Sequence, residues 1–352
     1  MGKIIRFERP PVIVSTGVVA GAKEADGGLA EYFDLCDRSD KFGKKTFEQA
    51  ESEMQRLALN FALKKAKLDP SVLDAMFAGD LMNQCTGSSY GLAAFSSAYF
   101  GLYGACSTAA EGLILGAMGV SSGCFKTVAT VSSSHNSSAE RQFRFPLEYG
   151  SQRPPTAQWT ATASAAFILS EFSVTGYVKD GKTASPKSQN CCAEPCVRVT
   201  EALPGRIVDK GITDQSNMGA AMAPAAASTL FSYFKESEKR AEDFDMILTG
   251  DLGYDGHSIC RDLLEGQGLS LGERFSDCGI LLYDRETQDT HSGGSGCGCS
   301  ASVVAGYVMD RFKKGEIHDV LLVGTGALMS PSSVLQGLSI AGIGHLVHLS
   351  TR

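Results

Sequence analysis

The chain has 352 residues, of which 43% are hydrophobic and 20% charged, a balance typical of a soluble globular protein with a substantial core. Its net charge of −7 excludes non-specific binding of nucleic acid, which requires a basic surface. No stretch of about 18 apolar residues is present to span a bilayer, so we expect any membrane association to be peripheral. Residues 1–14 lack the apolar core of a signal peptide, and an odd number of cysteines, 11, favours free thiols in an intracellular setting.

Two segments that end in small-Gly-Asp-Leu, residues 74–81 and 245–252, form the first pair of an internal repeat. Each is an apolar run that indicates a buried strand, with Asp80 or Asp251 at its carboxyl end. The charged helical segments that precede these strands cover residues 46–67 and 226–240.

A second pair, residues 104–110 and 298–303, opens two helices that are rich in small residues. Each helix leads into a β-rich run, which begins at Thr127 in one case and at Asp319 in the other. Because both pairs occur in the same order, the sequence favours a duplicated α/β fold, although any two βα units share some of these features. Two such halves would place their loops around a central cleft.

The expected organisation is a first half over residues 1–178 with a long loop at 134–160, a connecting segment at 179–205, and a second half at 206–352. Cys191, Cys192 and Cys196 in the connecting segment do not have a zinc-site spacing. The Gly-rich segment 291–299 favours a tight turn before a helix. We therefore expect no metal site.

Cys106 has the strongest chemical signal, because small residues flank it at a predicted helix start. Unpaired amides and the positive end of a helix dipole stabilise a thiolate there, although most free cysteines simply pack in a core. A nucleophilic cysteine needs a base. Among the six histidines, His135 and His257 follow predicted strand ends, although a histidine in such a place is more often an ordinary loop residue.

The predicted loop 134–160 combines arginines with aromatic residues. Guanidinium groups pair with carboxylates, and aromatic rings stack on flat ligands, so the loop is a candidate binding segment. Surface salt bridges are the alternative interpretation. The residues concerned are Arg141, Phe143, Arg144, Phe145, Tyr149 and Arg153.

The Cys106 segment and the strand that follows it resemble the nucleophile region of ketoacyl synthases and thiolases. More closely, the whole chain resembles the thiolase-like stage V sporulation proteins of endospore formers. The strings that carry this closer resemblance are residues 2–7, 140–146, 154–159, 248–256 and 324–332. The resemblance implies a thiolase-like fold in which the two halves form five layers, α-β-α-β-α.

Two residues depart from the catalytic pattern of the condensing enzymes. Asp251 aligns at or near the position of their histidine, and Cys297 aligns in place of their asparagine. A carboxylate near Cys106 disfavours the thiolate, whereas an imidazole would favour it. The resemblance therefore implies a protein that is not an enzyme.

The function that the resemblance implies is binding of dipicolinic acid, free or as its calcium chelate, during its uptake into the developing spore. The expected ligand-binding residues are Cys106, Asp80, His135, Arg141, Arg144, Asp251, His257 and Cys297. Asp80 and Asp251 either complete the calcium shell of the chelate or cap turns. No other cofactor is expected. Two alternatives stay open: an acyl-thioester condensing enzyme or thioesterase that uses Cys106, and a structural subunit that organises membrane partners.

The resemblance also implies a homodimer at the periphery of the forespore or spore inner membrane. The implied partners are the other stage V A sporulation proteins. The sequence does not identify the surface that would contact them.

Overall fold

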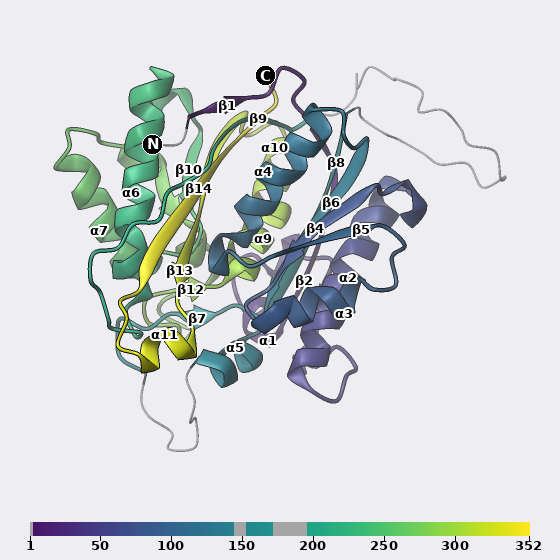
Figure 1. Ribbon diagram of the computed structural model, residues 1–352, viewed down its shortest axis with the longest axis horizontal. Coiled ribbons are helices and arrows are strands. Elements are labelled where there is room, and N and C mark those ends of the chain that lie inside the picture. The colour runs from purple at the N-terminus through teal and green to yellow at the C-terminus, as the bar shows by residue number, and fades with distance from the viewer. Residues whose placement is uncertain (1–2, 144–152, 172–195) are drawn as a thin grey trace.

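Twelve strands join in one sheet in this computed structural model, which describes residues 3–143, 153–171 and 196–352 (Figure 1). Along the sheet the strands follow the order β11-β10-β13-β14-β9-β2-β8-β6-β4-β5, with β1 beside β9 and β3 beside β2. A separate pair, β7 and β12, connects the two halves of the chain. The strands are β1 (Ile5–Arg6), β2 (Val12–Ala20), β3 (Leu35–Cys36), β4 (Ala75–Gly79), β5 (Ala98–Leu102), β6 (Thr127–Ser134), β7 (Trp159–Thr160), β8 (Ala163–Ser170), β9 (Arg198–Leu203), β10 (Met246–Thr249), β11 (Phe275–Asp277), β12 (Gly294–Ser295), β13 (Asp319–Leu328) and β14 (Ala341–Ser350).

The strand pairing shows the duplication directly. In the first half β5, β4 and β6 are parallel, and β8 and β2 continue the sheet in antiparallel pairs. The second half repeats this pattern with β11, β10, β13, β14 and β9. The two half-sheets meet where Val12 of β2 pairs with Arg198 of β9.

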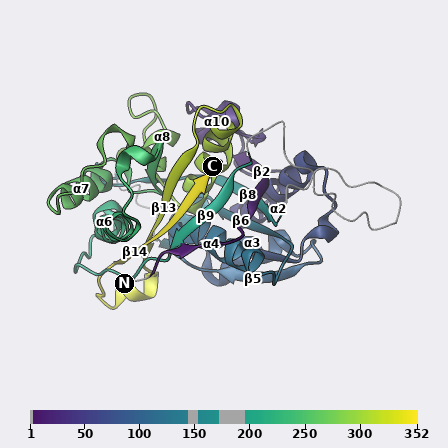
Figure 2. The ribbon, with the colours of Figure 1, turned by 90° about the horizontal axis from the view of Figure 1, so that it is seen from above.

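The helices complete five layers, which Figures 1 and 2 show from two directions. Helices α4 and α9 lie between the half-sheets, α2 and α3 cover the outer face of the first, and α6 and α7 cover the outer face of the second. This arrangement confirms the thiolase-like α/β fold. The helices are α1 (Ala22–Ala25), α2 (Phe47–Ala66), α3 (Thr86–Leu92), α4 (Thr108–Ser121), α5 (Asn136–Phe143), α6 (Met218–Ser237), α7 (Gly253–Glu265), α8 (Cys278–Leu282), α9 (Cys297–Val303), α10 (Met309–Lys313) and α11 (Pro331–Leu335).

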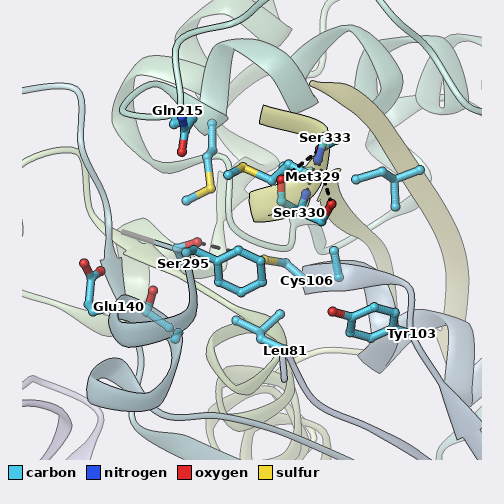
Figure 3. Close-up of a pocket in the computed structure, with 16 residues that line it drawn as sticks. Leu81, Tyr103, Cys106, Glu140, Gln215, Ser295, Met329, Ser330 and Ser333 are labelled. Carbon is cyan, nitrogen blue, oxygen red and sulfur yellow. Dashed lines mark hydrogen bonds between the residues drawn. The ribbon is translucent and has the colours of Figure 1, made fainter. Parts of the chain in front are cut away.

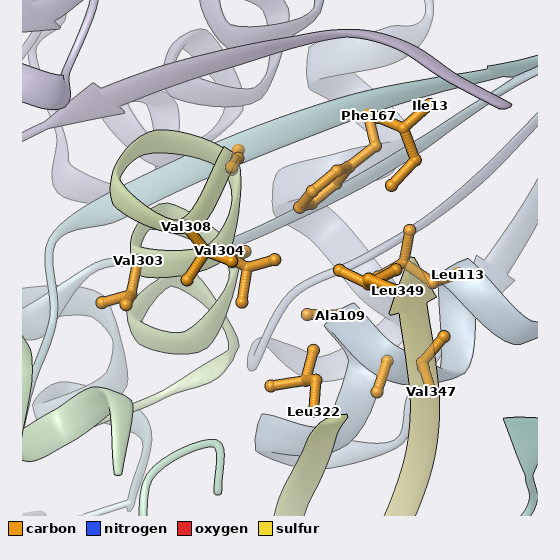
Figure 4. Close-up of a cluster of buried hydrophobic side chains, with 14 of the residues drawn as sticks. Ile13, Ala109, Leu113, Phe167, Val303, Val304, Val308, Leu322, Val347 and Leu349 are labelled. Carbon is orange, nitrogen blue, oxygen red and sulfur yellow. The ribbon is translucent and has the colours of Figure 1, made fainter. Parts of the chain in front are cut away.

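Alternating side chains along the strands supply a separate hydrophobic core on each side of a half-sheet. In β13, Leu322 packs into the central core between the half-sheets, whereas Leu321 packs under α6 and α7. In β6, Val128 likewise faces the central core and Ala129 faces α2. Figure 4 shows the central core, in which Leu113 of α4 contributes beside side chains from both half-sheets.

Two expectations about the connections are corrected. The predicted loop 134–160 begins with helix α5 and ends in strand β7. Its residues 139–142, Ala-Glu-Arg-Gln, are good helix formers, and Ala139 is buried on the inner face of the helix. The predicted connecting segment 179–205 contains β9, a strand of the second half-sheet, because the backbone of β9 pairs with the long strand β14.

Helices α1, α5 and α11 gather at one end of the molecule, and the two chain ends lie at the other (Figure 1). The carboxyl ends of β4 and β10, with Asp80 and Asp251 next in the chain, come from the two half-sheets. In the described part of the chain, none of the helices is both long and apolar enough to cross a membrane.

Candidate functional site

Cys106 lies in a tight turn, Ala105–Ser107, that leads directly into α4. Ala105 has a φ of 52°, in the left-handed region that is uncommon for residues other than glycine. The turn packs closely against β13, where a Cβ atom on Gly326 would lie 2.8 Å from the carbonyl oxygen of Gly104. Because Gly326 has no side chain, β13 can approach the Cys106 turn closely. As a result, Cys106 is only 6% exposed.

Asp251 stands next to Cys106, as the sequence predicts, and its carboxylate is held from several sides. The hydroxyl of Thr325 donates a hydrogen bond to Oδ1 at 2.7 Å. The amide of Gly296 and the hydroxyl of Ser295 donate to Oδ2 at 2.8 and 3.2 Å. These contacts fix the carboxylate just after the carboxyl end of β10.

The electrostatics of this pair work against a reactive thiolate. Burial, followed by the charge of Asp251, raises the pKa of the Cys106 thiol well above its ordinary value. Burial also raises the pKa of Asp251 to about 7, although its hydrogen bonds act in the opposite direction. Nucleophilic cysteines instead have a lowered pKa.

Cys297 lies close to the pair at the start of α9, and burial also raises the pKa of its thiol. Its sulfur donates a hydrogen bond to the carbonyl oxygen of Ser133 at 2.9 Å. The side chain packs in a small apolar cluster with Leu81, Cys106 and Ala139. Cys297 therefore packs against Cys106 on the inner side of the site.

A cavity of about 310 Å³ opens beside Cys106 (Figure 3). Such a volume is within the range of small-molecule sites. Among the described residues its lining includes no lysine, arginine or histidine, and Glu140 is its one carboxylate. The lining residues are Leu81, Tyr103, Ala105, Cys106, Ala139, Glu140, Phe143, Thr160, Gln215, Met218, Ser295, Ala327, Leu328, Met329, Ser330 and Ser333.

Asp80 is outside this lining although it occupies the repeat position of Asp251. Its buried carboxylate accepts hydrogen bonds from the amides of Met82 and Ser88, at 2.9 and 2.7 Å, and from the Ser88 hydroxyl. Asp80 thus organises its own turn, which was one of the two interpretations of this residue. Neither Asp80 nor Asp251 lines the cavity.

The two candidate histidines are also outside the lining. His135 Nε2 lies 2.8 Å from the carbonyl oxygen of Asp40, and its ring packs on Phe47. The ring of His257 stacks on Phe275 with a centroid separation of 4.3 Å. Burial lowers the pKa of both histidines, so neither supplies a buried cation to the site.

The predicted binding arginines do not meet in the cavity either. Arg141 points to solvent and forms an ion pair with Glu48 at 2.9 Å. Arg153 pairs with Asp289, while Phe143 of the same segment does line the cavity. Arg144, like Phe145, Tyr149 and the cysteine pair at 191–192, lies outside the described residues.

Several residues at the site were missed by sequence reasoning. Ser295 lies between Cys106 and Asp251, and Thr325 anchors the carboxylate from β13. The Gln158 side chain donates to the carbonyl oxygen of Asp251 at 2.6 Å and so ties β7 to this turn. The sequence could have indicated Thr325, because this residue lies near the carboxyl end of a predicted strand. Within the described ranges, no group of three or more potential protein ligands is arranged to hold a metal ion.

The sequence profile of stage V sporulation protein AD matches residues 2–350. The chain belongs to this family. It is 38% identical over 339 residues to stage V sporulation protein AD of Bacillus subtilis (strain 168), an alignment that covers 96% of this chain and 94% of that protein.

Solved structures with the same fold include 3-oxoacyl-[acyl-carrier-protein] synthase III from Aquifex aeolicus VF5, with a TM-score of 0.53 and 14% identity over 97% of this chain and 99% of that one. OleA from Xanthomonas campestris gives a TM-score of 0.59 with 11% identity, over 98% and 99% of the two chains. At this identity the likeness establishes the fold alone. The chain is thus a sporulation-family member built on the fold of condensing enzymes.

Proposed function

We propose that this protein binds dipicolinic acid, free or as its calcium chelate, for uptake into the developing spore, and does so without catalysis. The observation that carries the proposal is the cavity beside Cys106, a cysteine whose thiol has the carboxylate of Asp251 as its neighbour and not an imidazole. The aromatic ring of the ligand would pack on apolar side chains such as Phe143 and Met329. Its carboxylate oxygens would accept hydrogen bonds from hydroxyl groups such as those of Ser330 and Ser333.

The charge of the cavity favours one form of the ligand. The described lining has no cation, and Glu140 and the nearby Asp251 are both acidic. Against this described lining, a free dianion would lose its hydration without gaining an ion pair. In the calcium chelate the cation neutralises both carboxylates, so we expect the chelate to bind more tightly than the free acid.

The absence of catalysis follows from the chemistry required of a nucleophile. Acyl transfer needs a thiolate and a base to generate it. At neutral pH a buried thiol with a raised pKa stays protonated, and the adjacent Asp251 disfavours its ionisation further. The proposed role of Cys106 is to form part of the floor of a binding pocket.

The proposed assembly is a homodimer that acts with the other stage V A sporulation proteins at the forespore or spore inner membrane. Strand β5 lies at one edge of the sheet, and Tyr99 and Phe100 on it are exposed. An exposed, apolar edge strand favours pairing with another chain. We therefore propose β5 as the edge through which two copies join.

Calorimetric titration with dipicolinate, with and without calcium, tests the binding proposal. Wild type should bind saturably and bind the chelate more tightly, and Cys106→Ser should retain binding. Ser333→Phe should weaken binding by at least about tenfold by filling the cavity, whereas Ser332→Phe, at an exposed neighbouring position of the same helix, should not.

Two other outcomes would support the alternatives. Acyl transfer from coenzyme A thioesters that is lost in Cys106→Ser would indicate an active condensing enzyme or thioesterase. A well-folded protein with no saturable binding in either condition would indicate a structural subunit.

A further inference from the structure

Helix α5 forms one wall of the cavity and contributes Ala139, Glu140 and Phe143 to its lining. Ala139 and Phe143 pack in the same small cluster as Leu81 and Cys106. The position of α5 therefore determines whether the cavity is enclosed on this side.

The side chains of Gln142, Arg141 and Ser138 are among those that attach α5 to the rest of the protein. Gln142 donates to the carbonyl oxygen of Leu81 and accepts from the amide of Asn83, at 2.9 and 3.0 Å. Arg141 makes its exposed ion pair with Glu48. Ser138 donates to the Glu51 carboxyl of α2 at 2.6 Å, and this is the one attachment of the three in which both side chains are buried.

Glu51 is an unusual anchor, because it is a carboxyl group 1% exposed to solvent. Within the described part of the chain its contacts are the hydroxyls of Ser133 and Ser138, with no lysine or arginine. The Ser133 hydroxyl in turn accepts from Gln55 at 2.8 Å. Burial, followed by the nearby charge of Asp80, raises the pKa of Glu51 to about 8, although the hydrogen bonds with Ser138 and Ser133 act in the opposite direction.

The other titratable groups around Glu51 do not offset a negative charge on it. Asp80 and Glu48 are acidic, and both raise its pKa. Cys297, from α9, has a pKa that the presence of Glu51 raises in turn. On the α5 side, Arg141 is turned toward Glu48 at the surface.

We propose that neutral Glu51 latches α5 over the cavity as a positioning residue, so that deprotonation of Glu51 releases this wall and weakens ligand binding. The ligand part of this inference rests on the proposed function. The physical reason is that a buried anion is costly in a low-dielectric site, and displacement of α5 would hydrate it.

Linkage gives the direction and range of the effect. A carboxyl group with a pKa of about 8 when α5 is closed and near the ordinary 4.5 when it is open binds a proton more tightly in the closed state. The fraction of open α5 then rises with pH between these two values, by up to about tenfold per pH unit, and levels off above the higher one. Acidic conditions close the cavity and alkaline conditions open it.

Amide hydrogen exchange of α5 in the full-length protein tests the latch without ligand. Corrected for intrinsic exchange rates, protection of α5 in wild type should fall by about tenfold or more between pH ~5.5 and ~7.5. Glu51→Gln, which keeps a neutral side chain of the same shape, should remove this dependence. Glu53→Gln is the matched control from the same helix, because Glu53 pairs with Arg56 and Lys44 and neither partner lies on α5. It should behave like wild type.

A second variant keeps the proposal testable if Glu51→Gln does not fold. Ser138→Ala removes the hydroxyl on the α5 side, and α5 should then exchange rapidly at both pH values. Equal pH dependence of α5 exchange in wild type and Glu51→Gln would overturn the latch.

Calorimetry with calcium dipicolinate at the same two pH values adds the ligand readout. Wild type and Glu53→Gln should bind more weakly at the higher pH, and the Glu51→Gln variant should lose most of that difference. Binding with the same pH dependence in wild type and Glu51→Gln would refute the latch but leave the proposed function intact. No binding in any protein, together with the expected exchange pattern, would refute the proposed function and leave the latch standing.

Discussion

The sulfur of Cys106 lies 4.0 Å from the hydroxyl oxygen of Ser295. A serine hydroxyl cannot take a proton from a thiol at neutral pH, and behind it stands the Asp251 carboxylate, not an imidazole. The thiol of Cys106 therefore lies in a buried, hydrogen-bonded setting that disfavours its ionisation. This relationship leads to predictions about reactivity, pH and stability.

Cys106 should react slowly with alkylating reagents despite lying beside a cavity. Burial and Asp251 raise its pKa, so little thiolate is present at pH ~8, whereas Cys124 is exposed. We expect iodoacetamide to modify Cys106 at least about 100-fold more slowly than Cys124, as measured by peptide mass spectrometry over time. Preferential modification of Cys106 would contradict the picture of an inactive thiol.

The pH dependence of stability should report the buried Asp251. Its pKa is raised from 3.8 to about 7 in the folded protein, so its neutral form is favoured by folding. The stabilisation is fully present below the unfolded value and is lost as pH rises through the folded value. Asp251→Asn should therefore remove up to about 1.4 kcal/mol per pH unit from the slope of unfolding free energy between these values.

Chemical denaturation at a series of pH values measures this slope. Asp255→Asn, at a partly exposed position in the first turn of α7, is the control and should leave it unchanged. An Asp251→Asn protein with the same slope as wild type would show that Asp251 is ionised throughout this range.

The close approach of β13 to the Cys106 turn should make Gly326 intolerant of a side chain. A Cβ atom there would lie 2.8 Å from the Gly104 oxygen and 3.1 Å from the Ser107 nitrogen. Gly326→Ala should destabilise the protein by about 1–3 kcal/mol in urea denaturation, because backbone must shift to accept it. Gly28→Ala is the control, since a Cβ atom at Gly28 meets nothing within 4 Å. Equal stability of the two variants would contradict the close packing of the turn.

Two variants distinguish dimerisation through β5 from non-specific association of exposed apolar residues. Phe100 on the β5 edge is 45% exposed, and Leu335 on α11, outside the sheet, is 88% exposed. Phe100→Glu should shift the protein from dimer to monomer in size-exclusion chromatography with light scattering, because like charges would meet across the paired edges. Leu335→Glu should remain dimeric. A dimer that survives Phe100→Glu and dissociates with Leu335→Glu would move the interface to α11.

The sequence by itself determined the order of the elements and the duplication. Hydrophobic periodicity is a local property, and it located the strands that precede Asp80 and Asp251. The small residues around Cys106 indicated the helix start at which it lies. The resemblance to condensing enzymes then paired Asp251 with Cys106 correctly. Helix α5 was missed, because it is short and mostly polar and its burial depends on contacts with α2.

Only the tertiary structure decided which of the candidate residues share a site. Asp80 and Asp251 occupy equivalent positions in the repeat, yet Asp80 turns to its own loop and Asp251 to Cys106. His135 contacts Asp40 and Arg141 contacts Glu48, both outside the cavity lining. Ser295 contacts Cys106 although the two residues are far apart in the sequence. The physical reason is that the direction of a side chain at the end of a strand depends on the packing of distant segments around it, which local sequence patterns do not encode.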